Sequence, residues 1–439
     1  MEKRSKIQTF HISTYGCQMN LADTSTLMAT MINRGYRPVD NERDADLIIL
    51  NTCSVREKAE QRVFGRLGEI ARYKFRKPHL KIAVVGCMAQ RLGKELIEQV
   101  PHVDYVLGTD RVFELPDVIE DKPGTDQVMT ALGHENIDFI TPVKETPYSG
   151  FVTIARGCDN HCSYCIVPYV RGKERAHSTD YIIDSVRRMV NEGVVEITLL
   201  GQNVNSYSCD ETDFPDLLKR VAGETGVKRL RFMTSHPKDL SEKLVDLMAA
   251  EPKIMPHVHL PLQAGSNRVL KRMGRVYTVE HYLKIVEYIR KKLDYICLTT
   301  DLIVGFPGES EKEYEATLAV VRQVKFDSAF MFRYSTRPGT PAARYPDDVP
   351  EKDKIRRLNK LIAMQQEISR CQNQRELNQV RFSLVEGTSR RDATVLRART
   401  EGNKTVLFAS ENVAVGGVVP VRITEADAFT LHGQLEELT

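Results

Sequence analysis

Short apolar runs alternate with longer amphipathic stretches along most of this chain, and this alternation limits its possible folds more than any other feature. In the N-terminal third, each apolar run is typical of a strand buried on both faces, because it lacks the polar alternation of a half-exposed strand. Strands are predicted there at residues 7–13, 47–50, 82–85 and 105–107. Helical patterns follow the first three strands, so the sequence predicts an α/β domain with a parallel sheet.

A second alternating series follows a segment, residues 112–147, in which proline and glycine accumulate. Such a segment is typical of a linker, and we place the end of the first domain at residue 145. The second series predicts strands at residues 152–155, 196–200, 230–234, 258–260, 297–304 and 328–334. Six strand–helix units are too few for an eight-stranded barrel. We therefore expect a partial (β/α)6 barrel over residues 146–375, with a long polar helix beginning near residue 351.

The remaining residues, 376–439, change character to short alternating segments broken by glycines. This pattern predicts a small antiparallel β-barrel. The expected fold class is thus α/β, with a parallel N-terminal domain, a partial barrel and a small β-barrel at the C-terminus.

Composition and charge restrict the compartment and the chemistry. With 41% hydrophobic and 28% charged residues and no apolar run of membrane length, the chain is expected to be a cytoplasmic protein without a membrane partner. A net charge of +3 means that any nucleic-acid surface must be local. Nine cysteines in a reducing compartment favour metal or redox chemistry over disulfides.

One cysteine group stands in C-x3-C-x2-C spacing directly after the first strand of the second series, at Cys158, Cys162 and Cys165. A short loop can present all three thiolates to a four-iron cluster, and one iron then lacks a protein ligand and can bind a substrate. The alternatives are a zinc loop with His161 as fourth ligand and a set of unligated core cysteines.

Another group, Cys17, Cys53 and Cys87, is dispersed, but each member comes just past the carboxyl end of a predicted parallel strand. Because ligands of open α/β sheets bind at those strand ends, we expect the three thiols to converge on one centre. Gly16 and Gly86 would allow the backbone close to a bulky group. The alternative is three buried structural cysteines.

Basic residues gather in the C-terminal segment and could bind phosphates. They are Arg381, Arg390, Arg391, Arg397, Arg399 and Lys404. A solvated charged surface is the alternative.

Over essentially its whole length the chain resembles the radical S-adenosylmethionine (SAM) methylthiotransferases, and most closely those that act on tRNA. The resemblance rests on ordered motifs rather than on one short match. Besides the three-cysteine loop, they are residues 16–20 (GCQMN), 51–59 (NTCSVREKA), 200–205 (LGQNVN), 234–237 (TSHP), 301–309 (DLIVGFPGE) and 385–390 (VEGTSR).

This resemblance implies two 4Fe–4S clusters with three cysteine ligands each, an auxiliary one on Cys17, Cys53 and Cys87 and a SAM-binding one on the C-x3-C-x2-C loop. It also implies that the C-terminal barrel is a TRAM domain, which binds RNA. SAM would serve both as methyl donor and as source of the radical that removes an unreactive hydrogen.

By analogy with radical-SAM barrels, a set of residues at strand ends is expected to contact SAM. The set is Tyr164, Gly201, Gln202, Asn203, Gln263, Ile303, Val304 and Gly305. For Gln202, Asn203 and Gln263 the alternative is that they only cap turns.

The function implied is conversion of N6-isopentenyladenosine, next to the tRNA anticodon, to its 2-methylthio derivative. The expected partners are a tRNA anticodon stem-loop that carries isopentenyladenosine and an electron donor such as flavodoxin or ferredoxin. Two alternatives stay open. One is a sibling enzyme that acts on threonylcarbamoyl-adenosine or on a ribosomal-protein aspartate, and the other is a non-enzymatic, cluster-bearing RNA-binding regulator.

Overall fold

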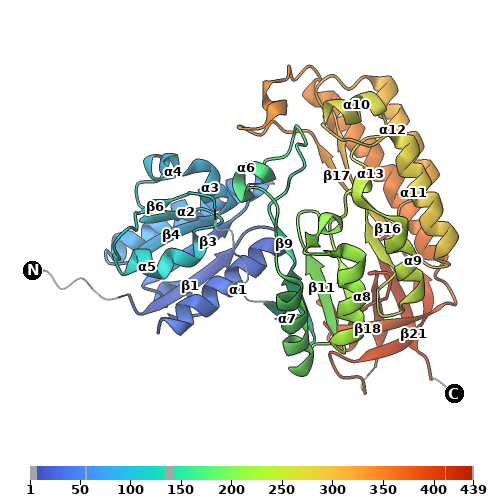
Figure 1. Cartoon of the computed structure of the whole chain (residues 1–439), viewed down its shortest axis with the longest axis horizontal. Helices are drawn as coiled ribbons and strands as arrows, with labels where there is room; N and C mark the ends of the chain where they lie inside the picture. The colour runs from blue at the N-terminus through green and yellow to red at the C-terminus, as the bar shows by residue number, and fades with distance from the viewer. Residues whose placement is uncertain (1–6, 55–56, 134–142, 411, 438–439) are drawn as a thin grey trace, which may run out of the picture.

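The structure, a computed structural model, describes residues 7–54, 57–133, 143–410 and 412–437. Its strands form three bodies, which Figure 1 shows as a blue N-terminal body, a green-to-orange central body and a red C-terminal barrel. This arrangement confirms the predicted fold class. Part of the predicted linker, residues 134–142, and residues 55 and 56 of the 51–59 motif lie outside the described residues.

The N-terminal body is a six-stranded parallel sheet in the order β2-β1-β3-β4-β5-β6. Its strands are β1 (Thr9–Thr14), β2 (Arg37–Pro38), β3 (Leu47–Thr52), β4 (Lys81–Gly86), β5 (Tyr105–Leu107) and β6 (Val128–Met129). The four predicted strands are therefore confirmed. The sequence does not indicate β2 and β6, since two residues are too few to show a period.

Helices cover both faces of this sheet, as the fully buried strands require. They are α1 (Gln18–Asn33), α2 (Glu57–Arg76), α3 (Cys87–Leu92), α4 (Lys94–Gln99) and α5 (Leu115–Ile119). Alternate residues of β3 point to opposite faces of the sheet. Ile48 packs in the hydrophobic core that includes residues of α2, whereas Ile49 packs in the core that includes residues of α1.

The central body contains the six predicted parallel strands, divided between two sheets. β8 (Ser149–Thr153), β11 (Glu196–Leu200) and β14 (Arg229–Phe232) form one sheet, and β15 (His257–His259), β16 (Cys297–Val304) and β17 (Ser328–Arg333) form the other. A bridge between Leu230 and Ile254 links β14 to the segment before β15. This is the open barrel that the sequence predicts, with one weak seam.

Two boundaries differ from the prediction. β7 (Val143–Thr146) pairs antiparallel with β8, so the predicted domain boundary at residue 145 falls inside a strand of the central sheet. The predicted strand 152–155 ends at Thr153, and β9 (Ala155–Arg156) instead pairs with β10 (Arg175–Ala176).

The helices of the central body follow its strands in the expected alternation. They are α6 (Val167–Arg171), α7 (Thr179–Asn191), α8 (Phe214–Glu224), α9 (Glu242–Ala250), α10 (Asn267–Arg272), α11 (Val279–Lys292), α12 (Glu311–Val324) and α13 (Glu351–Gln374). The small hairpin strands β12 (Ser208–Cys209) and β13 (Thr212–Asp213) precede α8. Short 3₁₀ helices occupy Glu42–Asp44, Val112–Glu114, Val204–Ser206, Pro237–Asp239 and Pro341–Arg344.

The C-terminal strands close into a barrel in the order β18-β19-β20-β22-β21. They are β18 (Val380–Thr388), β19 (Val395–Arg399), β20 (Thr405–Ala409), β21 (Val418–Ala426) and β22 (Thr430–Leu435). Four neighbouring pairs are antiparallel, but β20 and β22 are parallel. A ring of five strands cannot alternate direction throughout, so one parallel pair is unavoidable.

Buried ion pairs join the bodies. Asp23 of α1 accepts from Arg156 of β9 and from Arg171 of α6, the latter at 3.0 Å between Oδ2 and Nη2. On the other side of the central body, Arg229 donates to the carbonyls of Phe382 and Thr400 in the C-terminal barrel. Among the described residues, no helix is both long and apolar enough to cross a membrane.

Candidate functional site

A cavity of about 780 Å³ lies where the N-terminal body meets the central body, at the carboxyl ends of their parallel strands. Five of the six cysteines predicted as cluster ligands line it: Cys17, Cys53, Cys158, Cys162 and Cys165. The volume is within the range typical of small-molecule sites. The cysteine groups, over seventy residues apart in sequence, thus face one space.

The C-x3-C-x2-C loop is held by backbone contacts. The Ser163 N–H donates to the Met273 carbonyl at 2.8 Å, and its hydroxyl donates to the Arg272 carbonyl at 2.8 Å. A Cβ on Gly274 would come within 2.7 Å of the His161 carbonyl oxygen, so the segment after α10 must carry glycine to approach this closely. The loop is therefore fixed from below by α10.

Two of the loop sulfurs accept hydrogen bonds. Asn160 donates to Cys158 Sγ at 3.4 Å from both its backbone N–H and its Nδ2, and Arg275 Nη1 donates to Cys162 Sγ at 3.3 Å. Such donors stabilise negative sulfur. Burial, and then the neighbouring Cys162, raises the pKa of Cys165 to about 12. Thiolates in this loop consequently need a bound cation, which is how metal sites deprotonate their cysteines.

The other trio comes from three adjacent strands. Cys17 caps the N-terminus of α1 after β1, Cys53 directly follows β3, and Cys87 begins α3 directly after β4. Gly86 has φ +92°, and a Cβ there would lie 2.7 Å from the Thr52 carbonyl oxygen. Glycine is thus required for the chain to turn into α3.

Asn20 connects these strand ends. Its Nδ2 donates to Asn51 Oδ1 and to the Thr52 carbonyl, both at 3.1 Å, and its Oδ1 accepts from the Cys17 N–H at 3.3 Å. Cys87 is buried against Ile166 of the loop before α6 and does not line the cavity. Among the described residues, no three His, Cys, Asp or Glu side chains, those of the two cysteine trios included, are placed to hold a single metal ion.

Five of the predicted SAM contacts line the cavity: Tyr164, Gly201, Gln202, Asn203 and Gln263. Two of them also hold turns, as their alternative role requires. Gln202 accepts from the Gly157 N–H at 2.5 Å, and Asn203 accepts from the His236 N–H at 3.1 Å. Gln263 differs, because its φ is +68° and its buried Oε1 has no partner among the described residues.

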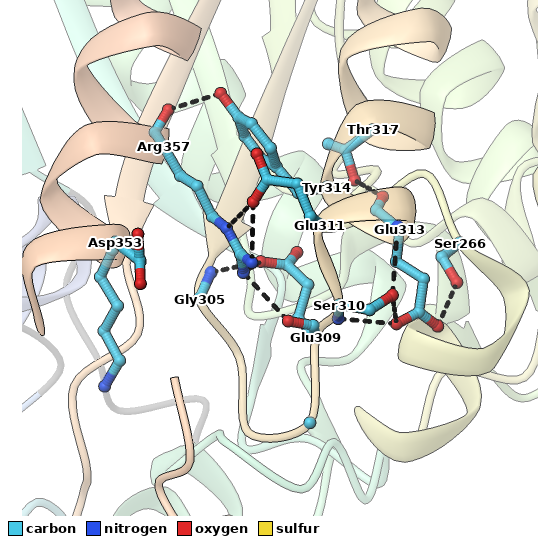
Figure 2. Close-up of polar contacts among 12 residues, drawn as sticks. Ser266, Gly305, Glu309, Ser310, Glu311, Glu313, Tyr314, Thr317, Asp353 and Arg357 are labelled. Carbon is cyan, nitrogen blue, oxygen red and sulfur yellow. Dashed lines mark hydrogen bonds and ion pairs between the residues drawn. The ribbon is translucent and has the colours of Figure 1, made fainter. Parts of the chain in front are cut away.

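The remaining three predicted SAM contacts, Ile303, Val304 and Gly305, do not line the cavity. Val304 is in the hydrophobic core, and Ile303 shares the opposite face of β16 with Asp301, which does line the cavity. Figure 2 shows Gly305 in the turn before α12, where its N–H donates to Glu309 Oε2 at 2.6 Å. Glu309 in turn accepts from Arg357 of α13 at 2.8 Å, so Gly305 serves the packing of this turn.

Several further residues that were not expected from the sequence line the cavity, notably Arg62, Ser235, His236, Arg275 and Asp301. Ser235 and His236 belong to the TSHP motif and Asp301 begins the 301–309 motif, so these motifs could have pointed to them. Burial, aided by Arg275, lowers the pKa of His236 to about 2, so its ring is neutral. The Ser235 hydroxyl is buried without a partner among the described residues. No sequence pattern marks Arg275 as a site residue, because only the fold brings it to the cysteine loop.

The structure does not bring the six predicted RNA-binding residues onto one open face. Lys404 is about one-tenth exposed and pairs with Asp327 and Glu376 at 2.9 and 3.1 Å. Arg381 lies over the Tyr295 ring at 3.6 Å and pairs with Glu376 at 2.6 Å. Both therefore anchor the C-terminal barrel to the central body.

The other four basic residues are more accessible. Arg397 and Arg399 both pair with Glu386, whereas Arg390 and Arg391 are exposed in the turn after β18. Arg397 and Arg399 line a second cavity of about 290 Å³ with residues of all three bodies. Gln18 of α1 lines both cavities, so they share a wall.

Comparisons with known proteins agree with this geometry. The chain matches the models of Uncharacterized protein family UPF0004 at residues 9–108, the Radical SAM superfamily at 152–321 and the TRAM domain at 374–435. Its fold is similar to that of the radical SAM methyltransferase TsrM from Kitasatospora setae, with a TM-score of 0.58 and 13% identity over 76% of this chain and 77% of that one. The radical SAM enzyme OxsB gives a TM-score of 0.54 at 13% identity, over 80% of this chain and 56% of OxsB. The fold and its cysteine loop therefore define a radical-SAM protein.

Full-length relatives narrow this class. A tRNA-2-methylthio-N(6)-dimethylallyladenosine synthase of Carboxydothermus hydrogenoformans is 45% identical over 98% of this chain and 99% of its own length. The enzyme of the same name from Dictyoglomus thermophilum is 43% identical over 97% of this chain and 98% of its own length. The chain belongs to the tRNA-2-methylthio-N(6)-dimethylallyladenosine synthase family.

Proposed function

We propose that this protein is a tRNA methylthiotransferase that converts N6-isopentenyladenosine beside the anticodon to its 2-methylthio derivative. The observation that carries the proposal is the single cavity lined by Cys17, Cys53 and all three cysteines of the C-x3-C-x2-C loop. A reaction that joins a radical source to a sulfur donor needs both within reach of one substrate atom, in a space that excludes water. The assignment of the substrate follows from membership of the family.

Two 4Fe–4S clusters and SAM are the cofactors of this reaction, and they supply the methylthio group and the carbon radical that removes the hydrogen of the target carbon. Cys158, Cys162 and Cys165 hold the SAM-binding cluster, with Asn160 and Arg275 donating to two of the sulfurs. Cys17, Cys53 and Cys87 hold the auxiliary cluster.

The residues around the cavity fit SAM chemically. The buried Gln263 Oε1 and Ser235 hydroxyl need hydrogen-bond partners, which the polar groups of SAM would provide. Neutral His236 adds a polar group to the cavity wall without adding a positive charge. Tyr164, Gly201 and Gln202 complete the wall that faces these groups.

The tRNA reaches the cavity from the side of the C-terminal barrel. The second cavity, whose wall includes Arg397 and Arg399, shares Gln18 with the cysteine cavity. Exposed Arg390 and Arg391 extend positive charge toward the flanking phosphates. The electron that the radical step consumes comes from a donor such as flavodoxin or ferredoxin, and the reaction takes place in the cytoplasm.

The test uses the full chain, purified without air and reconstituted with iron and sulfide. It is incubated with SAM, dithionite and an anticodon stem-loop that carries isopentenyladenosine, and 5′-deoxyadenosine and the methylthiolated nucleoside are measured. Cys158→Ala should abolish both products, whereas Cys17→Ala should retain 5′-deoxyadenosine and lose the nucleoside product. Cys371→Ala, at an exposed cysteine of α13, is the matched control and should change neither.

Two outcomes contradict the proposal. If the wild-type protein releases no 5′-deoxyadenosine, the non-enzymatic regulator becomes the better explanation. If a stem-loop with threonylcarbamoyladenosine is methylthiolated in place of the isopentenyl one, the substrate assignment is wrong.

A further inference from the structure

Arg171 is a buried charged residue that the proposed reaction does not yet use. It ends α6, the short helix that begins two residues after Cys165, and it is 3% exposed. Figure 1 shows α6 at the junction between the N-terminal and central bodies. α6 packs on α3, the helix that begins with Cys87. Arg171 thus belongs to the central body but lies against a predicted ligand of the auxiliary cluster.

The contacts of α6 place Arg171 between two strand ends that carry this trio. Cys87 is buried against Val170, the residue directly before Arg171. Arg171 itself donates through Nη2 to Asp23 of α1, the helix that begins after Cys17. The Nη1 atom of Arg171 is buried and has no hydrogen-bond partner among the described residues. Because buried donors are normally paired, we expect its acceptor to belong to the group that binds at this site.

The surrounding charges do not balance. Asp23 accepts from both Arg156 and Arg171, so two guanidinium groups share one carboxylate. Arg156 also donates at 3.1 Å to the Thr109 carbonyl oxygen, which carries no formal charge. Arg175, the next arginine of this interface, is paired separately with Asp110 at 2.8 Å. The cluster of Asp23, Arg156 and Arg171 therefore carries one net positive charge, and a buried net charge is strongly unfavourable without a counter-ion.

We infer that Arg171 is the counter-charge and hydrogen-bond donor of the auxiliary cluster, contributed across the body interface. This inference rests on the proposed function, since it requires a cluster on Cys17, Cys53 and Cys87. A four-iron cluster with three thiolate ligands is an anion and becomes more negative on reduction. A neighbouring guanidinium stabilises the reduced state more than the oxidised state, and so raises the reduction potential. The auxiliary site is thus complete only when the central body is docked.

The charge balance predicts opposite effects for the two partners of one ion pair. Arg171→Met removes the positive charge and should make the cluster harder to reduce, whereas Asp23→Asn removes the negative charge and should make it easier to reduce. Loss of docking alone would move both variants in the same direction. Arg171→Lys keeps the charge but loses the planar fork, so its shift should be smaller than that of Arg171→Met.

The experiment uses the full chain with Cys158, Cys162 and Cys165 changed to Ala, so that only the auxiliary cluster is present. After anaerobic reconstitution with iron and sulfide, the midpoint potential is measured by potentiometric titration, and folding is checked by circular dichroism. Arg171→Met should lower the ratio of reduced to oxidised cluster at a fixed potential by about tenfold, which is ~59 mV for one electron. Arg229→Met is the matched control, because it breaks a buried ion pair at the other interface, and its midpoint should equal that of the parent.

The inference is overturned if Arg171→Met keeps the parental midpoint, or if Asp23→Asn shifts it in the same direction. Should Arg171→Met fail to fold, Arg171→Gln against Arg171→Lys decides the matter, and equal midpoints in these two overturn it. If the parent itself binds no cluster that depends on Cys17, Cys53 and Cys87, the assignment of the auxiliary centre fails, and the role of Arg171 fails with it.

Discussion

Glu196 offers the sharpest test of how the C-terminal barrel is held. Its Oε2 accepts from Arg229 Nε at 2.9 Å and from Arg231 Nε at 2.8 Å. The free ends of the two guanidinium groups then donate to carbonyls of the C-terminal barrel, including Thr400, which accepts from Arg231 Nη2 at 2.8 Å. Glu196 is 7% exposed and Arg231 is 4% exposed. One carboxylate thus orients both arginines that bind the barrel.

We predict that Glu196→Gln weakens the docking of the barrel by about 3–5 kcal/mol, because it leaves two buried guanidinium groups without their counter-charge. That free energy corresponds to an increase on the order of 10²–10⁴ in the population of the open form. Glutamine keeps the shape and an acceptor oxygen, so the loss reports charge and not a cavity.

The same pair predicts a pH dependence. Burial alone would raise the pKa of Glu196, but Arg231 and Arg229 outweigh it and lower the pKa below its ordinary value of 4.5. A carboxyl whose folded pKa is depressed contributes its stability above the unfolded pKa and loses it as the pH falls through the folded value. Docking of the wild-type barrel should therefore weaken below about pH 4.5, and Glu196→Gln should show a smaller pH dependence in that window, because it lacks the contribution of Glu196.

Hydrogen exchange read by mass spectrometry measures this opening in the intact chain. Peptides that cover residues 380–405 should exchange on the order of 100-fold faster in Glu196→Gln at pH 7 than in the wild type. The control is Glu224→Gln, which breaks an exposed pair with Arg220 on α8 and should leave those peptides unchanged. Equal protection in Glu196→Gln and the wild type would refute the reasoning.

Two further predictions concern charge at the RNA and at the SAM-binding cluster. Changing Arg390 and Arg391 together to Ala should lower the salt dependence of binding to an isopentenyl stem-loop by about 1–2 in log–log slope, measured by titration at several salt concentrations, whereas Arg381→Ala should leave that slope unchanged because Arg381 faces Tyr295. Arg275→Met should make the SAM-binding cluster harder to reduce, since it removes the donor to Cys162 Sγ, and Arg275→Lys should restore part of the difference; equal midpoints in the two variants would contradict this role.

Much of the scaffold could be predicted from sequence because its pattern is local. The apolar runs of β3 and β4 predict a parallel sheet. Because parallel strands end at the same edge of a sheet, Cys53 and Cys87 are then expected at one edge. The parallel pairing of β20 with β22 was missed, since closure of a five-stranded ring is a property of all its strands together. Gly305 is expected near SAM by analogy with radical-SAM barrels; in the structure its φ is +70°, and a Cβ there would collide with the Lys354 side chain of α13.

The basic residues show why charge is the least predictable property. Lys404 and Arg381 were both expected to bind RNA, yet Lys404 pairs with the distant Asp327. Arg381 pairs with Glu376, five positions before it, and is covered by the ring of the distant Tyr295. Asp327 precedes β17 by one residue and lies 77 positions before Lys404, so no local window contains the pair. Arg275 and Arg171 are the same case at the cysteines, where only folding brings a guanidinium to a sulfur.

The distribution of the buried charges supports a role in orientation over one in stability. Replacing a buried ion pair by well-packed apolar residues of similar volume is often neutral or stabilising, so the triad of Asp23, Arg156 and Arg171 is weak evidence for a strong interface. The triad does restrict how the two bodies are oriented. A carboxylate whose two oxygens accept from two different guanidinium groups allows few relative orientations of those groups. The cysteine loop is set by α10 within the central body, whereas the Cys17, Cys53 and Cys87 trio is set by the sheet of the N-terminal body. A reaction that needs both cysteine groups around one carbon depends on the angle between the two bodies. The triad lies at the contact between those bodies and therefore helps to fix that angle.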